Sequence, residues 1–382
     1  MTKKKPIYLD YAATTPVDPR VAQKMGDCLS AEGSFGNPAS LHPFGTEALE
    51  KVENARKYIA RLLHVAARQI IFTSGATEAN NLAIKGVADF YLERGKHIVT
   101  LQTEHPAVLD TCAYLERKGF SVTYLRPKKN GLLDFDVFEA ALREDTILVS
   151  IMHVNNETGV IQDIDSIGRI TRRRGIFFHV DAAQSVGKIP IDLQKLKVDL
   201  MSLSAHKIYG PKGIGALYIN DTPRVRLIPQ LHGGGQERKM RAGTLATHQI
   251  IGMGEACRIL LEDLGADLIK IKKLRDLFWE GIKNLPATFL NVELDTTLPS
   301  ILNVRFESME KQALITAFKR LAFSTASACN STSIEPSHVL RAMGYNDKEA
   351  DHSFRFSFGR FTTIEEIEEA VAIIQEKYLK SL

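Results

Sequence analysis

The stretch 200–213 reads Leu-Met-Ser-Leu-Ser-Ala-His-Lys-Ile-Tyr-Gly-Pro-Lys-Gly and joins a short apolar run to a polar, reactive turn. Three of its first four residues are apolar, which predicts a buried strand over 200–203. Lys207 follows that strand almost at once. A lysine in this place is unlike the usual solvated lysine of a protein surface. The stretch therefore predicts a strand with a functional amine near its carboxyl end.

Short runs of the same kind recur on both sides of this stretch. They are rich in β-branched and aromatic residues, as expected for strands whose two faces are both covered. The predicted strands are 70–72, 97–99, 122–125, 147–151, 176–180, 200–203 and 216–219. Amphipathic segments lie between most of them, and one carries apolar residues three or four positions apart, at Leu49, Val52, Ala55, Ile59 and Leu62 or Leu63. The alternation predicts an α/β fold with a mainly parallel, seven-stranded sheet.

After about residue 250 the pattern changes. A long helical stretch comes first, and two strand-like runs, a further helix and a final amphipathic helix follow it. These segments cover about 250–284, 301–306, 311–320, 354–358 and 364–373. They predict a second, smaller α+β domain behind the large α/β domain.

The composition is that of an ordinary globular protein. Of the 382 residues, 44% are hydrophobic and 25% are charged, and 49 basic residues face 45 acidic ones, which leaves a net charge of only +4. This balance gives no argument for binding to nucleic acid or to a membrane surface, and no apolar run reaches the roughly 18 residues of a membrane span. The cysteines lie far apart without a Cys-x-x-Cys pair, which argues against disulfides or structural zinc and predicts a cytoplasmic protein with reduced thiols.

Polar, reactive residues collect directly after the predicted strands. The groups are Ser74–Thr77, Glu104–His105, Asn155–Glu157, Asp181 and Ser204–Lys207. In an open parallel sheet the carboxyl ends of the strands form one edge, and ligands bind there. One such residue after a strand is usually a turn or a helix cap, but so many groups at one edge predict a single shared site.

The segment Ser74–Thr77 has two interpretations. The more frequent one is a helix cap, in which a Ser or Thr side chain accepts a backbone hydrogen bond. The other is a phosphate cradle, because free amides and the helix dipole favour an anion at a helix N-terminus. Lys207 shifts the balance, since an amine for a Schiff base, a carboxylate such as Asp181 and donors for a phosphate are the groups that pyridoxal phosphate needs. Taken alone, Asp181 could equally cap a helix.

Taken as a whole, the chain resembles the cysteine desulfurases, which are pyridoxal-phosphate-dependent enzymes with the aspartate-aminotransferase fold (fold type I). The resemblance covers nearly the whole chain and rests on the order of many short motifs, which are Tyr8–Pro16, Phe35–Ser40, His153–Glu157, His179–Gln184, His232–Glu237 and Arg355–Thr362. The segment Ser327-Ala328-Cys329 resembles the long cysteine loop of the branch that supplies iron–sulfur cluster assembly.

The same resemblance implies a division of the chain into two domains. The large, cofactor-binding domain would span 15–258, and the small domain would combine 1–14 with 259–382 and carry a mobile cysteine loop at about 323–334. The chain ends at Leu382, whereas relatives dedicated to cluster assembly continue into a tail that docks a scaffold protein. The resemblance therefore implies the desulfurase chemistry more directly than it implies that docking.

The resemblance also implies which residues hold the cofactor. Lys207 would carry it and later move the substrate Cα proton, Asp181 would pair with the pyridine nitrogen, and Gln184 would bind the phenolic oxygen. Thr244 would reach the phosphate from the neighbouring subunit of a homodimer, although without the resemblance it is an ordinary loop threonine. Within the subunit, the phosphate would be held by Ala76 (through its backbone amide), Thr77, Ser204 and His206.

Four further residues would act on the substrate. His105 would stack on the cofactor ring and assist proton transfer, although a lone histidine after a strand is more often structural. Arg355 would bind the α-carboxylate, helped by Asn156, which also lies beside the cofactor. Cys329 would attack the substrate sulfur as a thiolate and form a persulfide. The usual interpretation of a cysteine, a buried and inert thiol, fits the other three better: Cys28, Cys112 and Cys257.

The activity implied is conversion of L-cysteine to L-alanine. The sulfur would pass from Cys329 to an acceptor protein, either a cluster scaffold or a sulfur carrier, for iron–sulfur clusters, thio-cofactors or tRNA. No intrinsic metal site is expected, although the Cys329 persulfide could ligate a cluster transiently. The alternative is a selenocysteine or cysteine-sulfinate lyase on the same fold, which needs no protein thiol. A non-enzymatic paralogue would have lost Lys207, Asp181 or Arg355, and an aminotransferase has no use for a cysteine loop.

Overall fold

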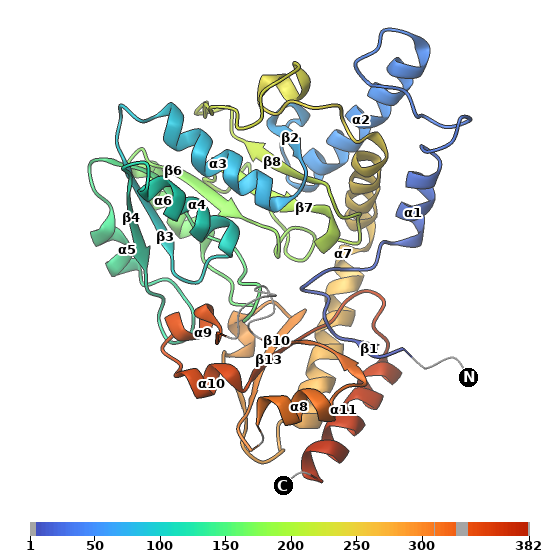
Figure 1. Cartoon of the computed structure of the whole chain (residues 1–382), viewed down its shortest axis with the longest axis vertical. Coiled ribbons are helices and arrows are strands. Elements are labelled where there is room, and N and C mark those ends of the chain that lie inside the picture. Colours follow the sequence, from blue (N-terminus) through green and yellow to red (C-terminus); the bar gives the residue numbers. More distant parts are fainter. Residues whose placement is uncertain (1–4, 309, 326–334, 381–382) are drawn as a thin grey trace.

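The computed structural model describes residues 5–308, 310–325 and 335–380, and Figure 1 shows its larger part above a smaller one. A seven-stranded sheet with the order β2-β8-β7-β6-β5-β3-β4 forms the centre of the larger part. These strands are β2 (Ile70–Thr73), β3 (His97–Leu101), β4 (Ser121–Leu125), β5 (Thr146–Ser150), β6 (Phe177–Asp181), β7 (Leu200–Ser204) and β8 (Gly215–Ile219). Only β8 runs antiparallel to its neighbours in this sheet, which confirms the predicted strands and their mainly parallel arrangement.

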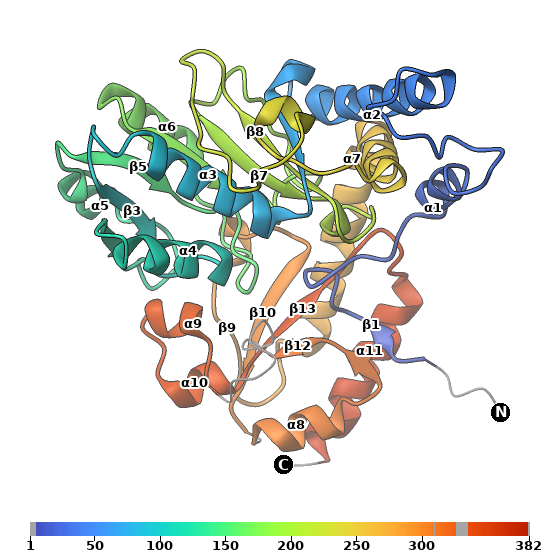
Figure 2. The same cartoon turned by 45° about the horizontal axis from the view of Figure 1, so that its top comes forward.

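Helices cover both faces of this sheet (Figure 2). One face is packed by α3 (Ala76–Phe90) and α4 (Pro106–Glu116). The other is packed by α2 (Pro43–Leu62), α5 (Phe135–Ala141), α6 (Ile164–Arg173) and the first half of α7 (Thr247–Ile282), with α1 (Pro19–Gly26) against α7. Because both faces are covered, the central strands are buried along their whole length, and their continuous apolar character follows from that burial.

The smaller part is built around an antiparallel sheet with the order β12-β13-β10-β9, beside a two-stranded parallel pair of β1 and β11. Its strands are β1 (Ile7–Tyr8), β9 (Thr288–Leu290), β10 (Ile301–Phe306), β11 (Leu321–Ala322), β12 (Ser324–Thr325) and β13 (Ser353–Ser357). Its helices are α8 (Lys311–Ala317), α9 (His338–Ala342), α10 (Asp347–Asp351) and α11 (Ile364–Leu379). The strands and helices expected after residue 250 are therefore present.

Each part has its own apolar core, and α7 contributes to both. The second half of α7 packs Ile271 and Phe278 against the aromatic side chains of β10 and β13. Phe278 lies 4.9 Å from Phe356, measured between ring centroids. The same core contains Ile7 and Leu9 from the start of the chain, so the first residues belong to the smaller part in space.

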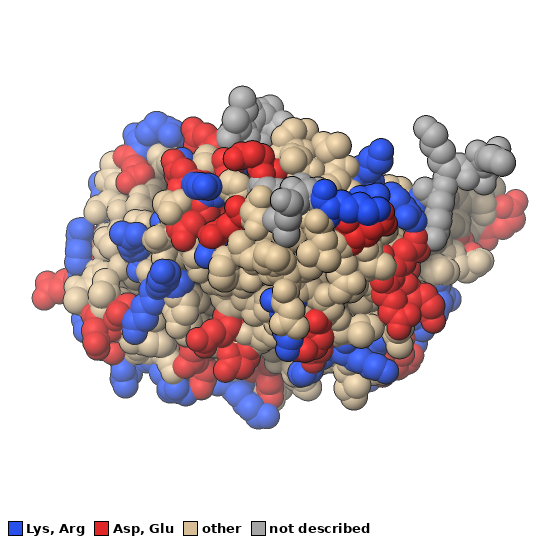
Figure 3. Space-filling view, turned by 90° about the horizontal axis from the view of Figure 1, so that it is seen from below, with Lys and Arg blue, Asp and Glu red and all other residues tan. Residues whose placement is uncertain are grey.

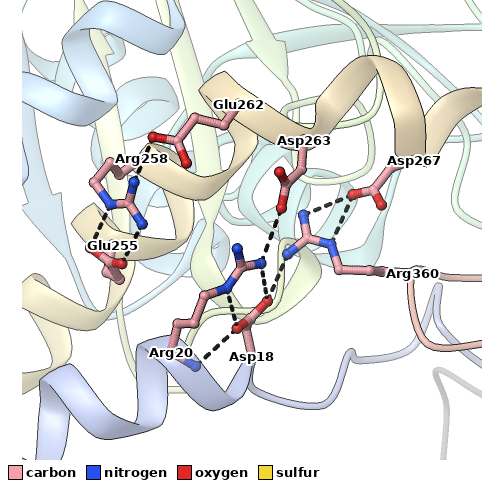
Figure 4. Close-up of polar contacts among 8 residues, drawn as sticks. All are labelled: Asp18, Arg20, Glu255, Arg258, Glu262, Asp263, Asp267 and Arg360. Carbon is pink, nitrogen blue, oxygen red and sulfur yellow. Dashed lines mark hydrogen bonds and ion pairs between the residues drawn. The ribbon is translucent and has the colours of Figure 1, made fainter.

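An ion network joins the two parts (Figure 4). Arg360, which follows β13, contacts Asp18 before α1 and Asp267 on α7, each at 2.8 Å. Its guanidinium also lies 4.5 Å from the centroid of the Tyr209 ring, just beyond Lys207. Because Asp18 and Arg360 are both largely buried, this contact fixes the position of the β13–α11 connection on the larger part.

The predicted apolar face of α2 is only partly confirmed. Val52, Ala55, Ile59 and Leu63 are buried, but 42% of Leu49 is exposed. The predicted cysteine loop begins with Ser324 and Thr325 paired to β13 as β12, and Cys329 lies outside the described residues.

The surface of the smaller part mixes both signs of charge. Figure 3 shows acidic and basic side chains side by side over the lower face rather than a field of one sign. No helix within the described ranges is long and apolar enough to cross a membrane.

Candidate active site

A cavity of about 460 Å³ opens at the carboxyl ends of the central strands, where the sequence predicts a shared site. Thr244 is exposed and does not line it, and Cys329 lies outside the described residues. The other predicted site residues all line this cavity: Ala76, Thr77, His105, Asn156, Asp181, Gln184, Ser204, His206, Lys207 and Arg355.

Lys207 ends a short 3₁₀ turn (Ala205–Lys207) that follows β7 directly. Its Nζ donates hydrogen bonds to the backbone oxygens of Ala12 at 2.7 Å and Ala13 at 2.8 Å. Tyr209, two residues later, has a φ of 65°, and its amide is held by the Thr15 hydroxyl at 2.8 Å. The N-terminal segment therefore fixes both the lysine amine and the strained turn that carries it.

Asp181 ends β6 and is buried at the floor of the cavity. One carboxylate oxygen accepts the Ala183 amide at 2.9 Å, which is the local capping contact expected of an ordinary turn aspartate. The other accepts the Asn80 side-chain nitrogen at 2.7 Å. Asn80 Oδ1 is itself buried without a hydrogen-bond partner in the described structure, and Asn80 also lines the cavity. A polar group that binds beside Asn80 and Asp181 would complete this cluster.

The start of α3 does not have the side-chain cap expected from the more frequent interpretation. Its N-cap is Gly75, and no side chain accepts a hydrogen bond from the first turn. Ser204 and His206 line the same cavity from the other side of the turn. Burial, followed by the charge of Lys207, lowers the pKa of His206 to about 4, so its ring is neutral near pH 7. Uncapped amides beside hydroxyl and imidazole groups fit a phosphate.

His105 has a structural role as well as a place in the cavity. It is the N-cap of α4, and its Nδ1 accepts the Ala107 amide at 3.0 Å. Burial lowers the pKa of this ring, so it is neutral near pH 7. With Nδ1 accepting, the neutral ring carries its hydrogen on Nε2. A neutral ring with a fixed tautomer can stack on an aromatic cofactor and exchange a proton through the other nitrogen.

Arg355 projects from β13 and only 3% of it is exposed. One terminal nitrogen donates to the backbone oxygen of Asn156 at 2.7 Å, and the other donates to Asp10 Oδ1 at 2.8 Å and to Ser324 Oγ at 2.9 Å. Its Nε has no hydrogen-bond partner among the described residues. A buried guanidinium with a donor still available is suited to binding a substrate carboxylate.

Sequence analysis missed two residues that complete this arrangement, namely Asp10 and Asn80. Asn80 could have been found, because it lies on α3 among the buried apolar residues Ala79, Leu82 and Ala83. Asp10 belongs to a motif that was noticed, but its pairing with Arg355 joins opposite ends of the chain and has no local signal.

The described cysteines are free and buried, as expected for inert thiols. Burial raises the pKa of Cys112 and that of Cys257 to about 12, and it also raises the pKa of Cys28. No cluster of three or more His, Cys, Asp or Glu side chains within the described ranges is placed to hold a metal ion.

Residues 7–370 match the model of the aminotransferase class-V family. The chain is 61% identical over 374 residues to the cysteine desulfurase IscS of Pectobacterium atrosepticum, which covers 98% of this chain and 93% of that protein. It is also 61% identical over 369 residues to the cysteine desulfurase IscS of Proteus mirabilis, which covers 96% of this chain and 91% of the relative.

Solved structures agree with this relationship. A NifS-like protein superposes with a TM-score of 0.92 at 38% identity and covers 99% of this chain and 100% of that one. The structure of SspA in complex with cysteine gives a TM-score of 0.84 at 41% identity, over 93% of this chain and 99% of the other. With an amine, a carboxylate and a phosphate cradle in one cavity, the chain belongs to the aminotransferase class-V family and, within it, to the pyridoxal-phosphate-dependent cysteine desulfurases.

Proposed function

We propose that this chain converts L-cysteine to L-alanine and transfers the sulfur, as a persulfide on Cys329, to an acceptor protein. One observation carries the proposal: Lys207, Asp181 and Arg355 line a single cavity at the carboxyl edge of the sheet. These residues supply an amine, a carboxylate and a guanidinium, which are the groups that an amino-acid-converting enzyme with this cofactor requires.

Different residues of the cavity would bind different parts of the cofactor. Lys207 would supply the amine that links it, Asp181 would hold the pyridine nitrogen, and Gln184 would donate to the phenolic oxygen. The phosphate would be bound by the amide of Ala76 and by Thr77, Ser204 and His206. The chemistry supplied by the cofactor in this position would be an electron sink that acidifies the substrate Cα hydrogen.

Other residues orient the substrate and move its protons. Arg355 binds the α-carboxylate, and Asn156, whose backbone oxygen holds Arg355 at 2.7 Å, assists it. The amine of Lys207, once free of the cofactor, takes the proton from Cα. His105 would stack on the ring of a bound cofactor, and its Nε2, left available by the contact of Nδ1 with Ala107, would exchange a proton with the substrate.

The sulfur step is balanced without an external oxidant. The Cys329 thiolate attacks the substrate sulfur, so an S–S bond forms while the Cβ–S bond breaks. The electron pair of that bond stays on the carbon, which takes up protons and leaves as alanine. The sulfur is thus oxidised as the carbon is reduced, and a later thiol reductant releases the persulfide sulfur as sulfide.

The test is to measure alanine and sulfide formed from L-cysteine with a thiol reductant present. The wild type should form the two products in equal amounts, and Cys329→Ala should form neither. Cys28→Ala, which removes a thiol outside the cavity, should behave as the wild type. Full activity in Cys329→Ala would overturn the persulfide step and favour the thiol-independent lyase. Assays with selenocysteine and with cysteine sulfinate would then identify the substrate of that lyase.

We infer that the chain acts as a homodimer in which Thr244 completes the partner's phosphate site. Support comes from large apolar side chains at the surface of α2 and the segment before it. Leu41 is fully exposed, and more than half of Phe35 and of Phe44 is exposed. An exposed apolar cluster of this kind is typical of a surface that another subunit covers.

A mixing experiment tests Thr244 directly. Lys207→Ala and Thr244→Val are each inactive or weak as homodimers, but their heterodimer contains one wild-type site if Thr244 acts on the partner. Activity should therefore rise when the two variants are co-refolded or co-expressed. No gain in a verified heterodimer would place Thr244 in its own subunit's site or outside any site.

We propose that the acceptor is a cluster scaffold or a sulfur-carrier protein of the cytoplasm, where the Cys329 thiol stays reduced between turnovers. With ³⁵S-labelled L-cysteine, label held on wild-type protein should move to a purified acceptor in a chase without free cysteine. Retention of the label on Cys329 would exclude that acceptor.

A further inference from the structure

Lys188 is a partly buried lysine that the reaction described above does not use. It lies one helical turn after Gln184, in the segment that follows β6. It lines a second, small cavity of about 20 Å³ between the two parts of the molecule, together with Tyr11, Tyr209, Asp267 and Ser300. Lys188 is therefore behind the cofactor cavity rather than in it.

A chain of hydrogen bonds connects Lys188 to the catalytic lysine. Lys188 Nζ donates to Gln184 Oε1 at 2.8 Å, and Gln184 Nε2 donates to the backbone oxygen of Ala12 at 2.8 Å. The same Ala12 oxygen accepts Lys207 Nζ at 2.7 Å. Gln184 and Ala12 both line the cofactor cavity, so Lys188 reaches that cavity through a single side chain.

The first contact determines how the Gln184 amide is turned. In its protonated form Lys188 can only donate hydrogen bonds, so the oxygen end of the amide faces it and the nitrogen end is excluded from this contact. The nitrogen end, with two donor hydrogens, then lies on the side of Ala12 and the cavity. The Ala12 oxygen can only accept a hydrogen bond, so it selects the same orientation from the other end, and Lys188 reinforces it by holding the amide oxygen.

The charges around Lys188 are mainly of its own sign. Lys207 from the 3₁₀ turn and Arg355 from β13 act on it, and burial and these two charges lower its pKa to about 7. Across the small cavity, Asp267 is held by Arg360 at 2.8 Å, and the remaining titratable groups there are Tyr11 and Tyr209. Because electrostatic coupling is reciprocal, a charge on Lys188 also disfavours a proton on the Lys207 nitrogen.

We propose that Lys188 is a positioning residue of the active site, which turns the Gln184 amide nitrogen toward the cofactor and disfavours protonation of the Lys207 nitrogen. The proposal rests on the roles given above to Lys207 and Gln184. Lys188 is not a catalytic residue, because its contact with the cavity runs through Gln184.

The experiment compares Lys188→Met, which removes the donor and the charge, with Lys188→Arg, which keeps both. The measurement is the visible absorption of the holoenzyme titrated with pH, which reports protonation of the nitrogen that links Lys207 to the cofactor. In Lys188→Met this transition should move upward by about one pH unit, the size expected for loss of a neighbouring like charge. In Lys188→Arg, whose guanidinium stays charged throughout the titration, it should not rise above the wild-type value.

Gln184→Met serves as the second variant. If Lys188 acts partly through Gln184, the shift caused by Lys188→Met should be smaller in the Gln184→Met background than in the wild type, as a double-mutant cycle measures. An unchanged transition in a folded, cofactor-loaded Lys188→Met protein would overturn the proposal. Borohydride reduction of the wild type that leaves the cofactor attached to a residue other than Lys207 would instead overturn the assignment of Lys207, so the two failures are distinguishable.

Discussion

At the scale of single residues, Arg355 shows how a buried charge is kept ready for a ligand. Its two terminal nitrogens are occupied by Asn156, Asp10 and Ser324, while Nε has no partner among the described residues. A guanidinium held in this way keeps its orientation without a substrate. Binding of a carboxylate then needs little reorganisation of the protein.

Arg355→Lys should therefore raise KM for L-cysteine more than it lowers kcat. A lysine keeps the charge but cannot bind Asn156, Asp10 and a carboxylate in the same planar arrangement. We expect a rise in KM of about 30-fold, which corresponds to about 2 kcal/mol of binding energy. Steady-state kinetics measure it, and an unchanged visible spectrum of the cofactor confirms that the fold is intact. A normal KM would show that the carboxylate binds elsewhere.

Thiol reactivity should single out Cys329. Burial raises the pKa of Cys112 and Cys257 to about 12, so almost none of either thiol is ionised at pH 8, and only the thiolate reacts. An alkylating reagent added to the native protein should modify Cys329 and leave these two unmodified, as peptide mass spectrometry would detect. Unfolding in denaturant should make all the thiols react, and equal rates in the native state would contradict the expected difference.

The grouping of these residues in one cavity was predictable because each reactive residue follows a strand that local pattern reveals. Asp181 and Lys207 were found in this way. Asp10 was not, since its partner Arg355 lies near the other end of the chain and only the fold brings the two to 2.8 Å. Lys188 was not found either, because a lysine four residues after a glutamine is a common surface pattern.

At the scale of elements, buried histidines join neighbouring strands of the large sheet. His179 on β6 lies between Ser150 Oγ on β5 at 2.8 Å and Ser202 Oγ on β7 at 2.9 Å. His97 on β3 bridges Thr146 and Thr123 in the same manner, at 2.7 and 2.8 Å. Each ring bonds a hydroxyl group on either side, and as a neutral ring it does so by donating from one nitrogen and accepting at the other.

His179→Gln should destabilise the protein most at alkaline pH. Burial lowers the pKa of His179 from 6.5 to about 4, so its contribution is complete above pH 6.5 and is lost as the pH falls toward 4. The loss of stability in the variant, about 2–4 kcal/mol at pH 8 by the cost of unsatisfied buried groups, should shrink by about 2 kcal/mol at pH 5. Urea denaturation with saturating cofactor at both pH values measures the difference.

The control for this experiment is His232→Gln, which changes an exposed histidine. Its effect should be small at both pH values. The stability of each variant is compared with that of the wild type at the same pH, because other buried groups also make stability depend on pH. Burial raises the pKa of Glu157 to about 7, so the contribution of Glu157 to stability falls as the pH rises from 4.5 to 7. If His179→Gln lowered the free energy of unfolding equally at both pH values, burial would not be lowering the pKa of His179.

The strands themselves were predictable, but their arrangement was only partly so. Runs such as 147–151 and 176–180 lie close to the observed β5 and β6, because burial on both faces leaves a continuous apolar signature. The antiparallel direction of β8 has no such signature, since apolar residues do not record which way a strand runs. The exposure of Leu49 was missed because periodicity identifies an apolar face without saying what covers it.

At the scale of the whole molecule, the two cores support the division into two domains. The expected boundary after residue 258 falls within α7, and we propose that the helix passes from the core of the large sheet to that of the smaller part between Leu260 and Ile271. Limited proteolysis cannot easily separate domains joined by a continuous helix. Hydrogen exchange should instead give two levels of protection along α7, with the change near this position.

Arg360→Met should weaken the connection between the two parts. Arg360 and Asp18 are largely buried, and the variant removes the guanidinium that pairs with the carboxylates of Asp18 and Asp267. Breaking a buried ion pair in this way costs about 3 kcal/mol. Arg258→Met is the matched control, because Arg258 lies on α7, the helix that carries Asp267 (Figure 4). Arg258 pairs within that helix with Glu255 and with the exposed Glu262, and its loss should cost less than about 1 kcal/mol. Equal losses in denaturant melts would contradict a special role for Arg360.

The pairing of β1 with β11 has a consequence for biosynthesis. Ile7 pairs with Leu321, so the first strand to leave the ribosome waits for a partner that is made near the end of translation. The large sheet can form earlier, because β2 to β8 are complete once Ile219 has emerged. Ala12 and Ala13, which hold Lys207, belong to the waiting segment. A nascent chain can therefore complete its largest core before the segment that orients Lys207 has its strand partner.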